Sequence, residues 1–106
     1  MDIEKKIRMA KLNECYGKVL TEYQSEMVRL YYDCDISLSE LAEDYGISRQ
    51  AVRDVLVRAE GILNELESKL TFLERTEELR DSIGGIMEQV DDTVKDALQL
   101  LLERLE

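Results

Sequence analysis

The chain has 106 residues, enough for one domain or for one domain with an appendage, and its 44% hydrophobic content excludes disorder throughout. It contains no His, which excludes a His-based catalytic triad and an imidazole metal site, and no Pro, so little interrupts helices. With 24 acidic and 14 basic residues the net charge is -10, so this is not a strongly basic nucleic-acid-binding domain.

The N-terminus, MDIEKKIRMA, lacks the continuous apolar core of a signal peptide, and no apolar run approaches the length of a membrane span. Cys15 and Cys34 are too far apart for a Cys-x-x-Cys site. These features indicate a cytoplasmic, reducing environment with two free thiols and no membrane insertion. No motif supplies a nucleophile with its base or a phosphate-binding loop, so we expect no enzyme activity, no catalytic residues, no metal and no cofactor.

Two helices are predicted in the first part of the chain. The first covers residues 3 to 18, where apolar residues recur at spacings of three and four on one face. Those residues are Met9, Leu12, Tyr16 and Val19. The second starts at Thr21, because Thr21 and Gln24 have the spacing of a capping box. Its apolar stripe consists of Tyr23, Met27, Leu30 and Tyr31.

A helix-turn-helix motif is predicted at about residues 38 to 60. Ser37 and Glu40 have capping-box spacing before a short helix, which stops at Gly46, a residue type that takes the left-handed conformation without strain. Ser48 then caps the next helix. Two helices joined by such a three-residue turn are typical of the helix-turn-helix, and the alternative is an ordinary helical hairpin.

The second helix of the motif is expected to have a core face and an exposed face. We expect the shared core to consist of Leu41, Ile47, Val52 and Val55. Leu56 and Val57 extend the apolar face of the helix toward the side that would contact nucleic acid. Arg49 and Arg53, four residues apart, can grip phosphate or a guanine edge, and Gln50 can pair with adenine. The candidate contact residues are Ser48, Arg49, Gln50, Arg53 and Arg58.

The motif's second helix is expected to continue through a row of leucines at spacings of three and four, Leu63, Leu66, Leu70 and Leu73. It is expected to break at residues 82 to 85, Ser-Ile-Gly-Gly. Asp91 or Asp92 then starts a last helix with a wide apolar stripe. Because so many leucines cannot stay in water, we expect a homodimer. The predicted fold is all-α: a helix-turn-helix domain over 1–70 with a long following helix, and a C-terminal helical extension over 71–106 that packs on the first part or on a dimer partner.

The segments LTEYQ, LYYDCDISLSELAEDYGISRQAV and RAE resemble the YlxM family of small bacterial helix-turn-helix proteins, and the likeness covers roughly residues 7 to 73. The resemblance implies an all-α fold, a helix-turn-helix similar to that of sigma-factor region four, and a homodimer. It also implies a regulatory role in the signal recognition particle pathway, because genes of the family lie beside those for the particle's GTPase and its receptor. This chain departs from the family pattern at Arg53, Val55 and Val57, where the resemblance implies an aromatic residue, a polar residue and a lysine, respectively.

Charge leaves two functions open. Residues 1–70 carry 14 acids and 10 bases, a net of -4, and residues 71–106 carry 10 acids and 4 bases, a net of -6. In the first interpretation, the protein is a regulator that binds nucleic acid, with DNA as one candidate, through the contact residues of the motif. In the second, the helix-turn-helix does not bind DNA and docks on a protein or RNA component of the signal recognition particle, with the acidic tail facing a basic partner.

Overall fold

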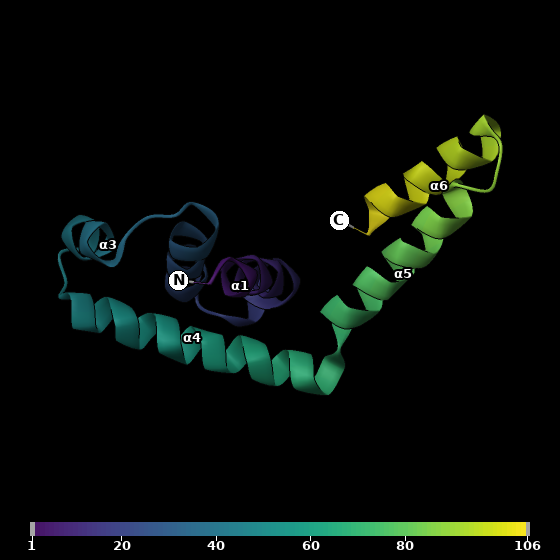
Figure 1. The fold of residues 1–106 in the computed structure, drawn as a ribbon. Helices are drawn as coiled ribbons and strands as arrows, with labels where there is room; N and C mark the ends of the chain where they lie inside the picture. The colour runs from purple at the N-terminus through teal and green to yellow at the C-terminus, as the bar shows by residue number, and fades with distance from the viewer. Residues whose placement is uncertain (1, 106) are drawn as a thin grey trace. The chain divides into compact units, whose positions relative to one another are not determined.

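The computed structural model describes residues 2–105, which form helices and connecting turns without any strand, so the predicted all-α class is confirmed (Figure 1). The chain divides into two compact units, Met1–Thr71 and Phe72–Glu106. No helix within residues 2–105 is long and apolar enough to cross a membrane.

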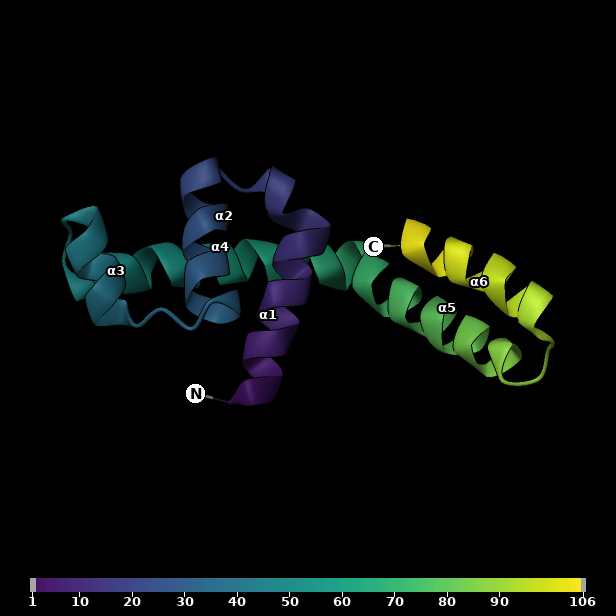
Figure 2. The same ribbon diagram turned by 90° about the horizontal axis from the view of Figure 1, so that it is seen from above.

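The first unit is built on one long helix. Its elements are α1 (Ile3–Tyr16), a 3-10 turn (Gly17–Val19), α2 (Glu22–Val28), a π-helical segment (Arg29–Asp33), α3 (Leu38–Tyr45) and α4 (Arg49–Leu70). Figure 2 shows α1 and α2 lying across α4, with α3 beside the N-terminal end of that helix. The core of the unit therefore lies between α4 and the three helices that pack on it.

Side chains mark the helix starts as the sequence predicts. Oγ1 of Thr21 accepts a hydrogen bond from the backbone N–H of Gln24 at 3.1 Å, and Oε1 of Gln24 accepts from the N–H of Thr21 at 3.1 Å. Oγ of Ser37 accepts from the N–H of Glu40 at 3.1 Å, which begins α3. These bonds satisfy backbone donors that have no partner within their own helix.

The predicted core face of the first helix is confirmed for Met9, Leu12 and Tyr16, which are buried, but it is wrong for Val19, which is 64% exposed. The reason is local: the chain leaves the α-helix after Tyr16 and tightens into a 3-10 turn, where the α-helical period no longer holds. Leu20, the next residue, is buried in place of Val19.

The apolar stripe predicted for the second helix is confirmed only in part. Met27 is fully buried, but Tyr23 is 41% exposed. The buried neighbours of Met27 are Val28 and Tyr32, and Tyr32 lies five residues along the chain. The segment after α2 is π-helical, so its backbone hydrogen bonds span five residues rather than four, and the buried face shifts by one position. The sequence carries no signal for that wider turn.

The second unit is a hairpin of two antiparallel helices, α5 (Phe72–Met87) and α6 (Asp92–Arg104), which pack against each other (Figure 1). Oδ1 of Asp91 accepts from the N–H of Val94 at 3.1 Å, which confirms the predicted start of the last helix. At the other end of α6, Nη2 of Arg80 donates to the carbonyl of Leu105 at 3.1 Å, and so holds the end of α6 against α5.

The helix break predicted at residues 82–85 is wrong, because the chain breaks at Thr71 instead. The helix that begins at Arg49 ends at Leu70, because Thr71 takes a left-handed conformation (φ 54) and its N–H bonds to the carbonyl of Glu67 at 2.8 Å. Residues 82–85 remain helical inside α5. Two glycines within a helix cost only about 1 kcal/mol each, which packing against α6 can offset. A β-branched residue in the left-handed region is a rare choice, so the sequence does not announce the break at Thr71.

Candidate nucleic-acid interface

The turn between α3 and α4 has the geometry of the predicted motif. Gly46 takes the left-handed conformation (φ 65, ψ 34), and the next N–H, of Ile47, bonds back to the carbonyl of Ala42 at 3.0 Å. Oγ of Ser48 then accepts from the N–H of Ala51 at 3.0 Å and opens α4. The chain is thus turned within three residues, and the side chains of the first turns of α4 emerge at a fixed place.

The face of α4 that enters the core is centred differently from the prediction. Val52 and Leu56 are buried, and so is Leu41 opposite them, whereas Ile47 and Val55 are only partly buried. The buried positions of α4 follow spacings of four and three: Val52, Leu56, Ala59 and Leu63. Leu56 therefore belongs to the core rather than to the outer surface, and of the apolar pair 56–57 only Val57, which is 66% exposed, faces solvent.

All five candidate contact residues are exposed. Arg49 and Arg53 are one helical turn apart, and Nη1 of Arg49 makes a long contact of 3.5 Å with Oγ of Ser39 on α3. Gln50 lies beside them, and its Nε2 donates to Oδ1 of Asp54 at 2.9 Å. The structure thus places Arg49, Gln50, Arg53 and Asp54 on the exposed side of the first two turns of α4, with the Ser48 cap directly before them.

Arg58 lies further along α4 than the other contact residues. It lines a shallow hollow of about 180 Å³ together with Asp54, Val55 and Gln24 of α2. Gln50, Asp54 and Arg58 follow each other at intervals of four, so they form one row on the helix surface. The contact roles of Ser48, Arg49, Gln50, Arg53 and Arg58 stay a prediction.

The electrostatics at the start of α4 favour an anion. The first turn of α4 contains no acidic residue, and Arg49 is its first residue. A helix N-terminus carries a partial positive charge and unpaired N–H groups, to which the two guanidinium groups of Arg49 and Arg53 add full charges. Asp54 is the acidic side chain within this exposed surface, and its carboxylate is engaged by Gln50.

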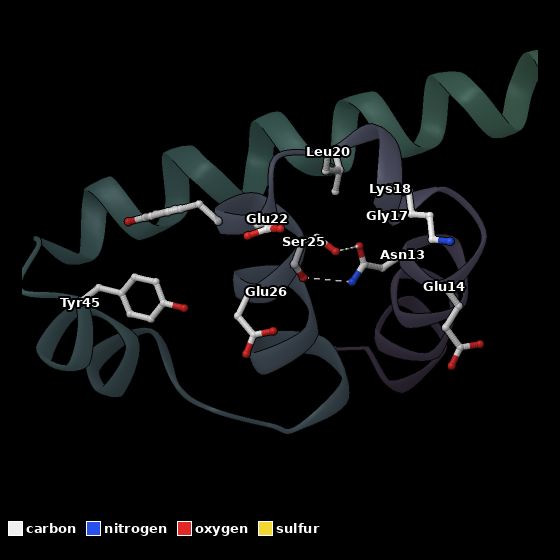
Figure 3. A pocket seen from close by; sticks show the side chains of 10 residues that line it. Asn13, Glu14, Gly17, Lys18, Leu20, Glu22, Ser25, Glu26 and Tyr45 are labelled. Atoms are coloured by element: carbon white, nitrogen blue, oxygen red, sulfur yellow. Dashed lines mark hydrogen bonds between the residues drawn. The ribbon is translucent and has the colours of Figure 1, made fainter.

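A second feature of the first unit is an open cleft of about 830 Å³, shown in Figure 3. Its charged lining consists of Glu14, Glu22, Glu26 and Lys18. Tyr23 and Tyr45 meet edge to face in its wall with ring centroids 5.3 Å apart. Its lining residues belong to α1, α2, α3 and the turns between them, and none belongs to α4. The cleft is therefore separate from the exposed face of the motif.

Hydrogen bonds between two lining residues of this cleft join α1 to α2, and the surroundings of two other lining residues shift their pKa values. Nδ2 of Asn13 donates to the carbonyl of Ser25 at 3.0 Å, and Oγ of Ser25 donates back to Oδ1 of Asn13 at 3.0 Å. The hydrogen bonds from Arg29 lower the pKa of Glu26. Burial, followed by the negative charge of Glu26, raises the pKa of Tyr45. Sequence reasoning missed this cleft because its residues come from separate helices and share no motif.

Within residues 2–105, no three His, Cys, Asp or Glu side chains are grouped so that they could hold a metal ion. Cys15 and Cys34 are both exposed, and neither forms a disulfide. Nη1 of Arg29 lies 3.3 Å from Sγ of Cys34.

The whole chain is similar to a family of bacterial proteins. Residues 3–103 match the family model UPF0122, described as "Putative helix-turn-helix protein, YlxM / p13 like". A UPF0122 protein of Halalkalibacterium halodurans is 39% identical over 105 residues, which are 98% of this chain and 96% of that relative. The UPF0122 protein YlxM of Bacillus subtilis is 36% identical over 107 residues, covering 100% of this chain and 97% of the relative. A relative from Clostridium kluyveri is 35% identical over 103 residues, with 97% and 93% covered. The chain therefore belongs to the UPF0122 family of YlxM- and p13-like helix-turn-helix proteins.

Proposed function

We propose that this protein is a regulatory protein that binds duplex DNA through the exposed face of α4. The observation that carries the proposal is that Arg49 and Arg53 stand exposed at the N-terminus of the second helix of a helix-turn-helix. The core does not use these side chains, since Val52 and Leu56 fill it from the opposite face. In this motif the second helix enters the major groove with its N-terminal residues against the bases.

The acidic remainder of the chain sets the strength of this binding. A net charge of -10 repels a polyanion, so binding depends on the local arrangement of Arg49, Arg53 and the helix terminus. Each phosphate contact releases counterions from DNA. We therefore expect binding that is weak on random duplexes and that falls steeply as salt rises.

A charge-matched pair of variants tests the proposal. Arg49→Glu with Arg53→Glu should abolish binding of a labelled duplex, measured by fluorescence anisotropy at low salt. Arg8→Glu with Lys18→Glu changes the net charge by the same amount, and both side chains are exposed, on α1 and on the 3-10 turn after it, outside α4 and outside the second unit. This control should bind like wild type apart from a small general repulsion. If both variants bind duplex DNA equally well, the face of α4 is not the contact.

We also infer that the protein acts as a homodimer formed through its second unit. No residue of α6 is buried, and Leu100 is 63% exposed and Leu101 49%. Each fully buried Leu contributes roughly 1.5–3 kcal/mol, so a second copy that covers this face gains several such contributions. A two-fold dimer would also bring two α4 helices into one molecule, one for each of two half-sites. Sedimentation equilibrium at micromolar concentration tests this, and a 12.3 kDa monomer would contradict it.

The alternative function is docking on a protein component of the signal recognition particle, which the family resemblance suggests. The cleft lined by Glu14, Glu22 and Glu26 favours this alternative, because three carboxylates beside an aromatic pair suit a basic protein surface. Titration of the particle's protein and of its RNA, each alone, against the full chain discriminates the two functions. Docking would be favoured if the Arg49→Glu, Arg53→Glu variant still binds the particle's protein and the Glu14→Lys, Glu22→Lys variant does not.

A further inference from the structure

An acidic side chain stands in the middle of the surface proposed to meet DNA. Asp54 is exposed on α4, one turn after Gln50 and next to Arg53. A carboxylate at this place repels phosphate and weakens non-specific binding. The carboxylate nevertheless has a defined partner on the same helix, because Oδ1 of Asp54 accepts a hydrogen bond from Nε2 of Gln50 at 2.9 Å.

This hydrogen bond fixes what the Gln50 side chain can offer a base. A glutamine amide has two N–H donors and one carbonyl acceptor. Since Asp54 accepts one of the N–H groups, the amide keeps one donor and one acceptor for a partner. The carboxylate cannot donate, so a flipped amide would bring two acceptors together and lose the hydrogen bond.

The remaining donor and acceptor of Gln50 match one base edge in the major groove. Adenine offers an N6 donor and an N7 acceptor, whereas guanine offers two acceptors, O6 and N7. Guanine would need both N–H groups of the amide, one of which Asp54 holds. The carboxylate of Asp54 would also face the acceptor edge of guanine unfavourably.

We propose that Asp54 is a positioning residue that orients Gln50 to select adenine and reject guanine in the major groove of DNA. The inference rests on the proposed function, because it needs α4 to lie in that groove. Arg49 and Arg53 supply affinity on the neighbouring row of the helix, and Asp54 lowers that affinity in exchange for base discrimination. A Gln–Asp pair four residues apart can also stabilise a helix, but that structural role alone would leave base preference unchanged.

The test is a selection from duplex DNA with a random central segment of about two helical turns, followed by sequencing of the bound fraction. The wild-type full chain should prefer adenine over guanine by roughly tenfold at one position of each half-site, within the range of a bidentate contact. Asp54→Ala should reduce that ratio to about twofold and should raise affinity for random duplex, since a negative charge is removed.

Two further variants separate positioning from a general effect. Asp54→Asn loses the charge as Asp54→Ala does, so it should bind random duplex as tightly as that variant. Its amide can accept from Gln50 in one orientation and donate to it in the other, so its adenine preference should lie between those of wild type and Asp54→Ala. Gln50→Ala should lose the preference, with binding to random duplex still salt-dependent. Circular dichroism checks that each variant is folded.

The outcomes of this selection are distinguishable. Asp54→Ala that keeps the wild-type ratio of adenine to guanine overturns the positioning role. Wild-type protein that binds duplex DNA in a salt-dependent way without any base preference also overturns it, but leaves the proposed function standing. Wild-type protein that binds no duplex at low salt overturns both.

Discussion

The hydroxyl of Tyr16 donates a hydrogen bond of 2.6 Å to Oε1 of Glu67, and both side chains are buried in the first unit. The bond joins α1 to the last turn of α4, across 51 positions of sequence. Glu67 is only 6% exposed, and its polar group depends on hydrogen bonds within the protein because it loses its hydration on burial. This pair therefore helps to fix where the long helix crosses α1.

Replacing Tyr16 with Phe should destabilise the fold. The change removes a donor from the buried carboxyl group of Glu67, and removing one partner of a buried hydrogen bond costs about 1–3 kcal/mol. Urea unfolding of Tyr16→Phe, followed by circular dichroism, should show a loss of that size in the free energy of unfolding. Tyr23→Phe, on a ring that is 41% exposed, is the matched control and should change it by less than about 0.5 kcal/mol. Equal stability of the two variants would show that the Tyr16 bond contributes nothing.

Two glycines of the first unit should respond to alanine in opposite directions. Gly46 has φ +65, and an added Cβ there would meet nothing within 4 Å, so only the backbone conformation opposes the substitution. Gly46→Ala should cost about 1–2 kcal/mol. Gly61 lies inside α4, also with open space around an added Cβ, and Gly61→Ala should stabilise by about 0.5–1 kcal/mol. Thermal unfolding of both variants checks the signs, and a stabilising Gly46→Ala would be inconsistent with the left-handed turn.

Ser48 should affect stability and DNA binding separately. Ser48→Ala removes the bond to the N–H of Ala51 and should cost about 1 kcal/mol. Ser48→Asp preserves the cap, so stability should stay near that of wild type. The new charge would stand directly before Arg49, however, and should weaken duplex binding in anisotropy titrations. Binding of Ser48→Asp at wild-type strength would place the DNA elsewhere.

The hydroxyl of Tyr45 should ionise at a higher pH than that of an ordinary tyrosine. Burial and then the charge of Glu26 raise the pKa of Tyr45 in the folded state. Because the pKa of Tyr45 is higher in the folded state, the protonated hydroxyl favours the folded protein. This stabilisation is fully present below the pKa of an unfolded tyrosine, about 10, and is lost as pH rises through the folded-state pKa. The difference in tyrosinate absorbance between wild type and Tyr45→Phe measures that pKa. Glu26→Gln should move it downward, and an unchanged titration would remove Glu26 as a cause.

The local signals of this sequence predicted the motif well. The capping residues Thr21, Ser37 and Ser48 and the left-handed Gly46 act through the backbone of their own turn, so their spacing alone defines the helix ends. The exposure of Arg49 and Arg53 followed from the same reasoning. These features depend on few residues, all close together in the chain.

The features that the sequence did not reveal depend on packing or on unusual backbone conformations. The π-helical segment after α2 shifts the buried face to Tyr32, and a β-branched residue, Thr71, ends α4. The Gly84–Gly85 pair, an ordinary helix breaker, stays within α5, which packs against α6. The hydrogen bond between Gln50 and Asp54 required the rotamers of both side chains, although their spacing of four allowed it.

In the proposed function Arg53, on the exposed face of α4, contacts a DNA phosphate or base edge. The most direct measurement is the salt dependence of duplex affinity for wild type and for Arg53→Ala. The logarithm of the association constant should fall linearly with the logarithm of salt concentration, by about 0.9 for each phosphate contacted. Arg53→Ala should bind more weakly and, if the contact is to phosphate, with a slope smaller by about one. An affinity and a slope equal to those of wild type would contradict the account.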